Sequence, residues 1–480
     1  MAEDRENRTS EHPEDSLRQV MDLIARHRLV ENLVHKQDMP RHELVESLVH
    51  KQNLAELQKK LDQLHPADVA YILEALPLED RLLVWDLVKA ERDGDILIEV
   101  SDAVRESLIA SMDNQELVAA AASLDTDEIA DLAPDLPKDV VQELLRSLDA
   151  AKRAQVVSSL SYREDSVGAL MDYDFVTIRA DVTVEVALRY LRRLGELPSH
   201  TDKLFVVERE GKLVGVLPIK RLLVHDPDVH LAAIMVDDPV TFRPEDDASD
   251  AAQAFERYDL ITAPVVDAGG KLIGRLTVDV VVDFIREQTE SDMLALAGLR
   301  EEEDLFTTVW KAAKNRWMWL GINLCTALVA SRVVGAFEGS IEKLAALAAL
   351  MPIVAGLGGN TGNQTGTLVV RGLALGLITR DNALRLLVKE LGISLLNGAV
   401  WGSVMGVVTY LLYGNVGLGA VMAMAMLLNL TVAALAGFFA PTLIDRLGRD
   451  PAFGTAVLIT FITDSMGFFI FLGLATVFLL

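Results

Sequence analysis

A single carboxylate, Asp464, lies near the middle of the last apolar stretch of the sequence, 451–480. An unpaired carboxylate at bilayer depth costs at least ~2.5–3.5 kcal/mol, so such a residue normally faces a cavity or a cationic partner. Helical spacing places Ala456 and Thr460 on the face of Asp464, as a lane of small side chains leading to it. The pattern favours a site for a passing cation. The alternative is a protonated aspartate that is hydrogen-bonded within a helix bundle.

Glycine and amide residues gather in a second apolar stretch, in MPIVAGLGGNTGNQTG at 351–366. Proline removes a helical donor and glycine permits a break, so the block predicts irregular backbone whose carbonyl oxygens line a water-filled path. The alternative is helix packing through small residues. Three amides within residues 360–364 exceed what packing needs. The residues of this block that we expect to line the path are Pro352, Gly356, Gly359 and Asn360.

The oxygen ligands of these two stretches indicate the kind of ion. The sequence has no Cys and His cluster with metal-ligand spacing, which argues against zinc or copper as the cargo. Mg²⁺ keeps several of its waters and uses few carboxylates, so it fits a sparse site of carboxylate, amide and carbonyl oxygens. Ca²⁺ prefers a richer oxygen cage, and manganese stays open.

Charge divides the chain into two halves. The 480 residues include 45 Lys and Arg against 71 Asp and Glu, a net charge of −26, which argues against nucleic acid as a partner. From Arg316 onward nine basic residues stand against seven acidic ones, so the negative charge lies in residues 1–315. The N-terminus shows no basic-then-apolar signal segment, and we expect residues 1–315 to be cytoplasmic. The single cysteine, Cys325, cannot form an intramolecular disulfide.

Five stretches are long enough for the ~20 residues that cross a hydrocarbon core as a helix. They are 317–337, 344–370, 391–413, 416–444 and 451–480. Lys and Arg cluster before the first, after the second and after the fourth, which places those connections inside and the C-terminus outside the cell. Arg332, late in the first stretch, is expected to snorkel to the outer interface, and a pore role is the alternative.

The soluble half begins with short amphipathic helices over 16–165, which predict a small helical superhelix. A local duplication relates LVENLVHKQDM at 29–39 to LVESLVHKQNL at 44–54. Its two histidines, His35 and His50, are predicted to be solvated helix residues and not metal ligands.

An α-β-β pattern then occurs twice. A helix at 185–194 precedes strands at 203–208 and 212–219, and a helix at 250–260 precedes strands at 262–267 and 271–278. This tandem unit resembles a pair of CBS modules, which often bind adenine nucleotides or report ligand state to an attached channel. The nucleotide pattern is imperfect, with Gly215, Pro218 and Arg221 in the first copy and Gly274, Thr277 and Asp279 in the second. ATP binding at these modules stays an open option.

Several blocks together resemble the MgtE-type magnesium channels over residues 43–480. Besides the CBS-like pair, they are RWMWLGINL (316–324), AFE (336–338), PIVAGLGGNTGNQ (352–364), LIDRLGRDPA (443–452) and the spacing from there to Asp464. The resemblance implies a homodimer in the lipid bilayer, in which the second and fifth spans of both protomers line a shared pore and paired Asp464 side chains hold hydrated Mg²⁺.

The resemblance also implies that the cytosolic part is a Mg²⁺ sensor. Divalent ions between acidic surfaces would draw the cytosolic domains together and hold a connecting helix over the pore, and without these ions the like charges repel. The candidate metal-binding residues besides Asp464 are Asp450, Asp279, Asp283, Glu287, Glu290, Asp292, Asp127 and Asp131. For each of them the alternative is a solvated acidic face.

The predicted fold class is a mainly α membrane protein with a tandem α/β CBS pair. The predicted domains are an N-terminal helical extension (1–42), a superhelical N domain (43–165), two CBS modules (166–235 and 236–290), a connecting helix (291–315) and a five-helix transmembrane domain (316–480).

The function that we expect is Mg²⁺-selective, Mg²⁺-gated magnesium uptake across the inner membrane, without catalysis. No phosphate-binding GxxxxGK[ST] loop supports ATP-driven pumping. The alternatives are a membrane-tethered sensor of nucleotide or Mg²⁺, whose spans only anchor it, and an ion-coupled divalent cation exporter.

Overall fold

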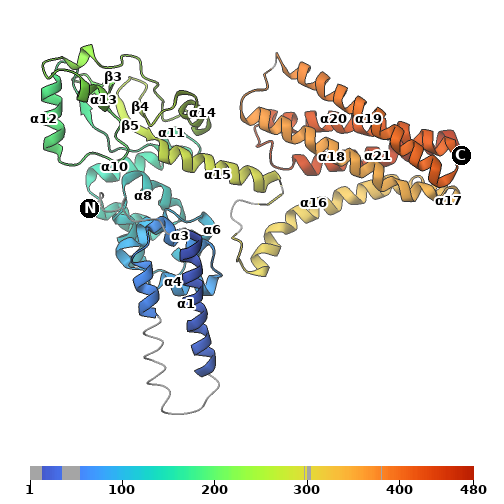
Figure 1. The fold of residues 1–480 in the computed structure, drawn as a ribbon, viewed down its shortest axis with the longest axis horizontal. Helices are drawn as coiled ribbons and strands as arrows, with labels where there is room; N and C mark the ends of the chain where they lie inside the picture. The colour runs from blue at the N-terminus through green and yellow to red at the C-terminus, as the bar shows by residue number, and fades with distance from the viewer. Residues whose placement is uncertain (1–12, 35–53, 297, 300–303, 380) are drawn as a thin grey trace. The chain divides into compact units, whose positions relative to one another are not determined.

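The protein folds into two compact units. The computed structural model describes residues 13–34, 54–296, 298–299, 304–379 and 381–480. One unit comprises Met1–Glu287 with Asp304–Thr307, and the other comprises Gln288–Glu303 with Thr308–Leu480 (Figure 1). The first holds a helical domain followed by two small sheets, and the second is helical. The predicted fold class, a mainly α protein with an α/β pair in its middle, is confirmed.

The helical domain is a repeat of helix pairs with a period of 24 residues. Buried apolar residues recur at this spacing in Ile72, Ile96, Ala120 and Leu144, and they belong to one core. The helices, in chain order, are α3 (Pro66–Glu74), α4 (Leu78–Trp85), α5 (Asp93–Leu97), α6 (Asp102–Ile109), α7 (Asn114–Ala122), α8 (Thr126–Leu132), α9 (Lys138–Ser147) and α10 (Ala150–Ser159), with single 3-10 turns at Ala90–Arg92 and Ala133–Asp135. The superhelix predicted from the amphipathic pattern is therefore a regular repeat.

Short side chains fix where these helices begin. Asp113 accepts hydrogen bonds from the backbone N–H groups of Gln115 and Glu116 at 2.8 and 2.9 Å, and the Glu116 carboxylate accepts one from the Asp113 N–H at 2.9 Å. This capping box satisfies donors that a helix start leaves free. Asp149 caps α10 by accepting hydrogen bonds from the N–H groups of Ala151 and Lys152.

An additional helix, α1 (Pro13–Val34), joins the core of this domain. Its Val20 and Ile24 are buried in the same cluster as the α3 side chains. The predicted N-terminal extension thus contributes to the packing of the superhelical domain. Most of the duplicated segment, with His35 and His50, lies outside the described residues.

The two α-β-β units form two small sheets. In the first, β1 (Thr177–Ile178) runs parallel to β2 (Lys203–Val207), and β2 pairs antiparallel with β3 (Leu213–Pro218). In the second, β4 (Thr262–Val266) pairs antiparallel with β5 (Leu272–Thr277). The helices around them are α11 (Val167–Leu170), α12 (Val184–Leu194), α13 (Ile219–Val224), the 3-10 turn Leu231–Ala233 and α14 (Ala248–Tyr258). Both predicted copies are present, with strand and helix order as expected.

The helix that follows the second sheet corrects the predicted connecting helix at 291–315. Helix α15 runs from Val278 to Leu296, so it begins at the end of β5 and ends earlier than predicted. Gly298, at φ +73°, adopts a left-handed conformation that a continuing helix does not allow. The next helix begins after Thr308, which has extended backbone at its N-cap position.

Besides the end of α15, the second unit contains six helices among its described residues. They are α16 (Val309–Gly335), α17 (Glu338–Lys343), α18 (Ala346–Ala374), α19 (Ala383–Tyr413), α20 (Val416–Arg446) and α21 (Thr455–Leu479). Helix α20 packs against α18, α19 and α21. Glycines let the backbones approach closely, as small residues do in membrane bundles: a Cβ on Gly402 or Gly406 would lie 2.8 Å from the carbonyl oxygen of Ala423 or Gly419.

Four of these helices, α16, α19, α20 and α21, are long and apolar enough to cross a membrane, within the part of the chain that the structure describes. They correspond to the first, third, fourth and fifth predicted spans. The second predicted span is α18, which has 29 residues, and the amides of Asn360, Asn363 and Gln364 lower its mean hydropathy. A helix of this length can cross a hydrocarbon core if its polar face is covered by protein or water.

Candidate functional site

A cavity of about 450 Å³ lies beside Asp464 in the second unit. Asp464, Thr460 and Ala456 line it from α21, as their spacing on one helix face predicts. Asn323 and Thr326 line it from α16. The cavity therefore places one carboxylate, two hydroxyls and an amide around a common space. These hard oxygen groups suit a hydrated Mg²⁺ ion.

The packing of α21 against α18 directs Asp464 into this cavity. Thr463 is fully buried, and its side chain lies 3.4 Å from the position that a Cβ on Gly362 would take. Successive side chains on a helix point about 100° apart, so fixing Thr463 against α18 turns Asp464 to a neighbouring face. At the start of α21, Trp319 packs edge-on against Phe453 at 4.8 Å and lies against Gly454. This contact holds α16 beside the first turn of α21.

The glycine and amide block is a continuous helix, which corrects the predicted irregular backbone. Residues 351–366 are α-helical throughout, and Pro352 lies within α18. Gly358, Gly362 and Gly366 serve close packing, which is the alternative interpretation. A Cβ at Gly358 would lie 2.3 Å from the Asn429 amide, and one at Gly362 or Gly366 would lie 2.5 or 2.6 Å from Ile459. Close partners on one side accompany an unbroken helix where the sequence alone suggests a break.

The opposite face of α18 is uncovered in the single chain. Pro352, Gly356, Asn360 and Gln364 are exposed at four-residue spacing. A Cβ at Gly356 would meet open space, whereas Gly359 faces Thr463, whose hydroxyl would lie 3.8 Å from such a Cβ. The structure thus places three of the four predicted residues of this block on one polar face of α18, separate from the residues that line the Asp464 cavity.

Asn429 of α20 is a buried polar residue that the sequence interpretation missed. It is fully buried, and its Nδ2 donates to the carbonyl oxygen of Val354 at 2.9 Å. Gly358 and Gly467 leave the room that its side chain occupies. Asn429 therefore joins α18, α20 and α21 at one level of the bundle. An asparagine inside an apolar run was the available signal, as were Asn323 and Thr326 in the first span.

We expect Gly358→Ala to destabilise the protein, because the new Cβ would overlap the Asn429 amide. Overpacking a close contact costs about 1–3 kcal/mol. Gly356→Ala is the matched control on the same helix, where the Cβ meets open space and alanine favours the helix. Thermal unfolding of the intact protein in detergent measures both. An equal melting temperature for the two variants would contradict the packing role of Gly358.

Acidic residues predicted as sensor ligands meet in the first unit. Partial burial, then repulsion from Asp131 and Asp102, raises the pKa of Glu287 on α15 to about 7. Burial also raises the pKa of Asp131, which lies 3.3 Å from Arg105. Burial raises the pKa of Asp283 as well, with a smaller contribution from Asp279. The start of α15 and the superhelical domain thus bring like charges together.

A second acidic contact involves Asp127. Burial, then the Asp172 carboxylate, raises the pKa of Asp127 to about 7. Asp172 is itself held by Arg275, whose Nε donates to it at 2.7 Å. At both places carboxylates lie partly desolvated beside other carboxylates.

The remaining predicted ligands have local contacts. Asp279 lies 3.4 Å from His200. In the second unit, Asp292 accepts from the Gln288 amide at 3.1 Å, and Asp450 accepts from the Ala452 N–H at 2.8 Å. Glu290 also lies in the second unit, on α15. Among the described residues, no group of three or more His, Cys, Asp or Glu side chains has the geometry of a metal site.

The raised pKa values predict that Mg²⁺-free protein loses stability as the pH rises. A carboxyl group whose pKa is raised on folding keeps its proton to a higher pH in the folded chain than in the unfolded chain. The stability that it contributes is therefore fully present below about pH 4 and is lost as the pH rises to about 7. We expect the melting temperature to fall between these pH values, by about 2–4 °C for each kcal/mol of unfolding free energy that is lost. Thermal unfolding of the intact protein at a series of pH values measures the melting temperature. In Asp127→Asn, the melting temperature should decrease less as the pH rises. A pH-independent melting temperature would contradict it.

Residues of the imperfect nucleotide pattern have structural contacts in the CBS-like pair. A Cβ at Gly215 would lie 2.6 Å from the Val236 carbonyl oxygen, and one at Gly274 would lie 2.9 Å from the Met171 sulfur. The Arg221 guanidinium donates to the carbonyl oxygens of Ile234 and Met235. These glycines permit close approach of neighbouring segments, and Arg221 ties α13 to the following turn.

Comparison with known protein families gives matches along most of the chain. The profile described as MgtE, divalent cation transporter, matches residues 351–474. The MgtE intracellular N domain matches residues 64–165, and the CBS domain matches 167–227 and 231–287.

Individual relatives agree with these matches. The chain is 31% identical to the magnesium transporter MgtE of Thermus thermophilus over 437 residues, covering 87% of this chain and 94% of that protein. It is 33% identical to the magnesium transporter MgtE of Enterococcus faecalis over 68% of this chain and 72% of that protein. Among solved structures, it is similar to the cytosolic domain of the Mg²⁺ channel MgtE in complex with ATP, at 30% identity and a TM-score of 0.45, covering 50% of this chain and 98% of that one.

Proposed function

The chain belongs to the MgtE family of divalent cation transporters, and on that premise we propose that it is a Mg²⁺-selective channel for magnesium uptake that cytosolic Mg²⁺ closes. It is a multi-pass membrane protein of a transporter family and not an enzyme. The observation that carries the proposal is the cavity beside Asp464, where a carboxylate inside an apolar bundle faces hydroxyl and amide groups.

The chemistry of this cavity suits a hydrated Mg²⁺ ion as substrate. Mg²⁺ dehydrates reluctantly and binds through one or two carboxylates with its waters retained. Six waters at about 30 Å³ each occupy about 180 Å³, which the cavity of about 450 Å³ can hold. Asp464 would supply the negative charge, and Thr460, Asn323 and Thr326 would accept hydrogen bonds from the waters of the ion.

A homodimer would complete the pore. The uncovered face of α18 carries Asn360 and Gln364, which cost free energy against lipid unless water or protein covers them. A second copy of α18 across a two-fold axis would enclose a polar path between the two faces. Pro352, Gly356 and Asn360 would then line this path, and the paired Asp464 side chains would hold the ion near it.

The acidic contacts of the first unit would form the sensor. Partly desolvated carboxylates repel one another, and a divalent cation between them removes the repulsion, as the raised pKa values of Asp127 and Glu287 indicate. Mg²⁺ would therefore favour the closed arrangement of the superhelical domain, the CBS pair and α15. The first unit would lie in the cytoplasm and the C-terminus outside the inner membrane, and ATP at the CBS pair is a further regulatory candidate.

Ion flux into liposomes containing the purified protein tests the proposal. We expect Mg²⁺ to enter down an imposed membrane potential and the flux to fall when Mg²⁺ is raised on the side of the first unit. A flux that requires a proton or sodium gradient and persists without potential would indicate an ion-coupled exporter. A protein that binds Mg²⁺ and conducts no ions would be a membrane-tethered sensor.

A further inference from the structure

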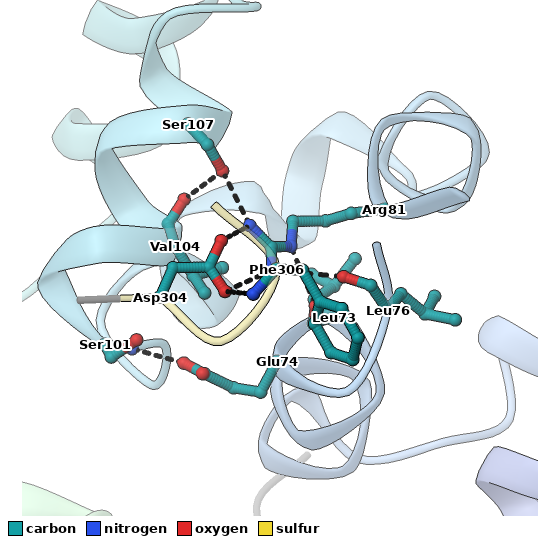
Figure 2. A network of polar contacts seen from close by, with 9 residues as sticks. All are labelled: Leu73, Glu74, Leu76, Arg81, Ser101, Val104, Ser107, Asp304 and Phe306. Atoms are coloured by element: carbon teal, nitrogen blue, oxygen red, sulfur yellow. Dashed lines mark hydrogen bonds and ion pairs between the residues drawn. The ribbon is translucent and has the colours of Figure 1, made fainter. Parts of the chain in front are cut away.

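Arg81 of α4 is a fully buried cation whose negative partner comes from a distant part of the chain. Its Nε and Nη2 donate to the carbonyl oxygens of Leu73 and Leu76 at 2.9 and 3.1 Å. Its Nη1 donates to the Ser107 hydroxyl at 3.2 Å and to Asp304 at 2.8 Å, and its Nη2 donates to the other Asp304 oxygen at 3.1 Å (Figure 2). Asp304 lies in the segment between α15 and the first membrane helix.

The next repeat of the superhelix builds the same arginine site from its own residues. Arg105 lies 24 residues after Arg81, and it donates to the carbonyl oxygens of Leu97 and Val100, which stand at the same offsets. Its carboxylate partners are Asp131, Asp135 and Asp102, at 3.3, 3.0 and 3.6 Å. Arg105 is thus neutralised within the superhelix.

The equivalent positions for Arg81 carry no charge. Ser107 and Ser111 stand 24 residues before Asp131 and Asp135. The neighbouring acid on α4, Asp80, pairs with Arg28 at 2.7 Å. A buried guanidinium without a counter-charge is strongly destabilising, so this repeat needs a carboxylate from outside it. Both serines are smaller than the aspartates that stand at the equivalent positions of the next repeat.

Asp304 supplies the carboxylate that this repeat lacks. Its two oxygens bind the guanidinium in the bidentate geometry that is the strongest arginine and carboxylate contact, and its side chain is 10% exposed. Asp304 Oδ1 also accepts from the Phe306 N–H at 2.9 Å (Figure 2). The Thr307 N–H donates to the Asp304 carbonyl at 3.1 Å. This turn presents the carboxylate, while Leu305 stays 90% exposed. The contact depends on the charge pair and the turn.

We propose that Arg81, Ser107 and the carbonyl oxygens of Leu73 and Leu76 form a docking socket for the Asp304–Phe306 turn, and that this socket latches the superhelical domain to the chain entering the first membrane helix. Helix α16 begins at Val309, a few residues after the turn. A change in the position of the superhelical domain then acts on α16 directly, in addition to any action through α15.

Ser111→Asp is the decisive variant. Ser111 is equivalent to Asp135 in the next repeat, so an aspartate at position 111 should pair with Arg81 as Asp135 pairs with Arg105. The new carboxylate would replace Asp304 and release the turn. The buried guanidinium would keep a counter-charge. Asp304→Ala removes the docking group itself. Ser147→Asp is the matched control, because Ser147 is another exposed serine whose hydroxyl donates to the carbonyl three residues before it, as that of Ser111 does.

Electron-electron distance measurements on the full-length protein in nanodiscs test docking without reference to transport. Spin labels are attached to cysteines at Leu305 and Glu79, both 90% exposed, with Cys325 replaced by serine. We expect a narrow distance distribution in the native chain and in Ser147→Asp, and a broad one in Ser111→Asp and Asp304→Ala. Distributions that stay equally narrow in Ser111→Asp and Asp304→Ala would overturn the docking.

The regulatory role of the latch rests on the proposed channel function. In liposomes, we expect Ser111→Asp to raise the Mg²⁺ concentration for half-suppression of flux roughly tenfold, a typical coupling between linked sites. An unchanged concentration in a variant whose turn is released would overturn the latch as a regulator. A protein without any flux would overturn the channel proposal, and the distance measurement would still decide the docking.

Discussion

Asp464→Ala is expected to reduce Mg²⁺ flux in liposomes by about a hundredfold. Among the described residues that line the cavity, Asp464 is the one charged group, and its interaction with a passing divalent ion offsets the cost of holding either charge inside the bundle. Losing about 2.5–3.5 kcal/mol of that stabilisation corresponds to about two powers of ten in rate. Asp464→Asn should reduce the Mg²⁺ flux nearly as much, because the asparagine amide keeps the shape of the side chain and removes its charge.

The control for this variant is Asp445→Ala, which removes an exposed carboxylate at the end of α20. It changes the net charge of the second unit equally and should leave the flux unchanged. Both variants must melt as the native protein does, so that loss of flux is not loss of folding. Normal flux through Asp464→Ala would mean that ions take another route, and the cavity beside Asp464 would then have a structural role.

Local patterns in the sequence predicted most elements of the first unit and one face of the last helix. Amphipathic spacing predicted the helices around Ile72 and Leu144, and alternation predicted the strand pairs of the CBS-like modules. The same helical spacing placed Ala456, Thr460 and Asp464 on one face, and the structure brings them to one cavity. These features depend on neighbours a few residues apart, which a single sequence displays.

Features that depend on distant neighbours were missed or misread. The block at 351–366 predicted a broken helix, because the partners that fill the glycine gaps, Asn429 and Ile459, lie on other helices. The 24-residue period, on which Arg81 and Arg105 also lie, was missed, since other equivalent positions such as Ile72 and Ala120 share only apolar character. The pairing of Arg81 with Asp304 joins residues 223 positions apart and leaves no local pattern.

Glu287→Lys is expected to reduce flux at low cytosolic Mg²⁺ roughly tenfold, as though the sensor were already loaded. Glu287 lies where Asp131, Asp102 and Asp283 act on it together with one guanidinium, that of Arg105. An ammonium group at this position would attract the carboxylates and replace the divalent ion that otherwise brings them together. The closed arrangement would then form without Mg²⁺.

Flux at low and high Mg²⁺ on the side of the first unit distinguishes this effect from a general loss of activity. Glu287→Lys should conduct poorly at both concentrations, whereas Glu256→Lys, which makes the same charge change on the exposed part of α14, should keep the native response. Glu287→Gln should fall between them, because it removes one repulsive charge and adds no attraction. If Glu287→Lys responds to Mg²⁺ as the native protein does, this acidic contact is not part of the sensor. Reversing a charge at a surface that a metal ion bridges must change the dependence on that metal.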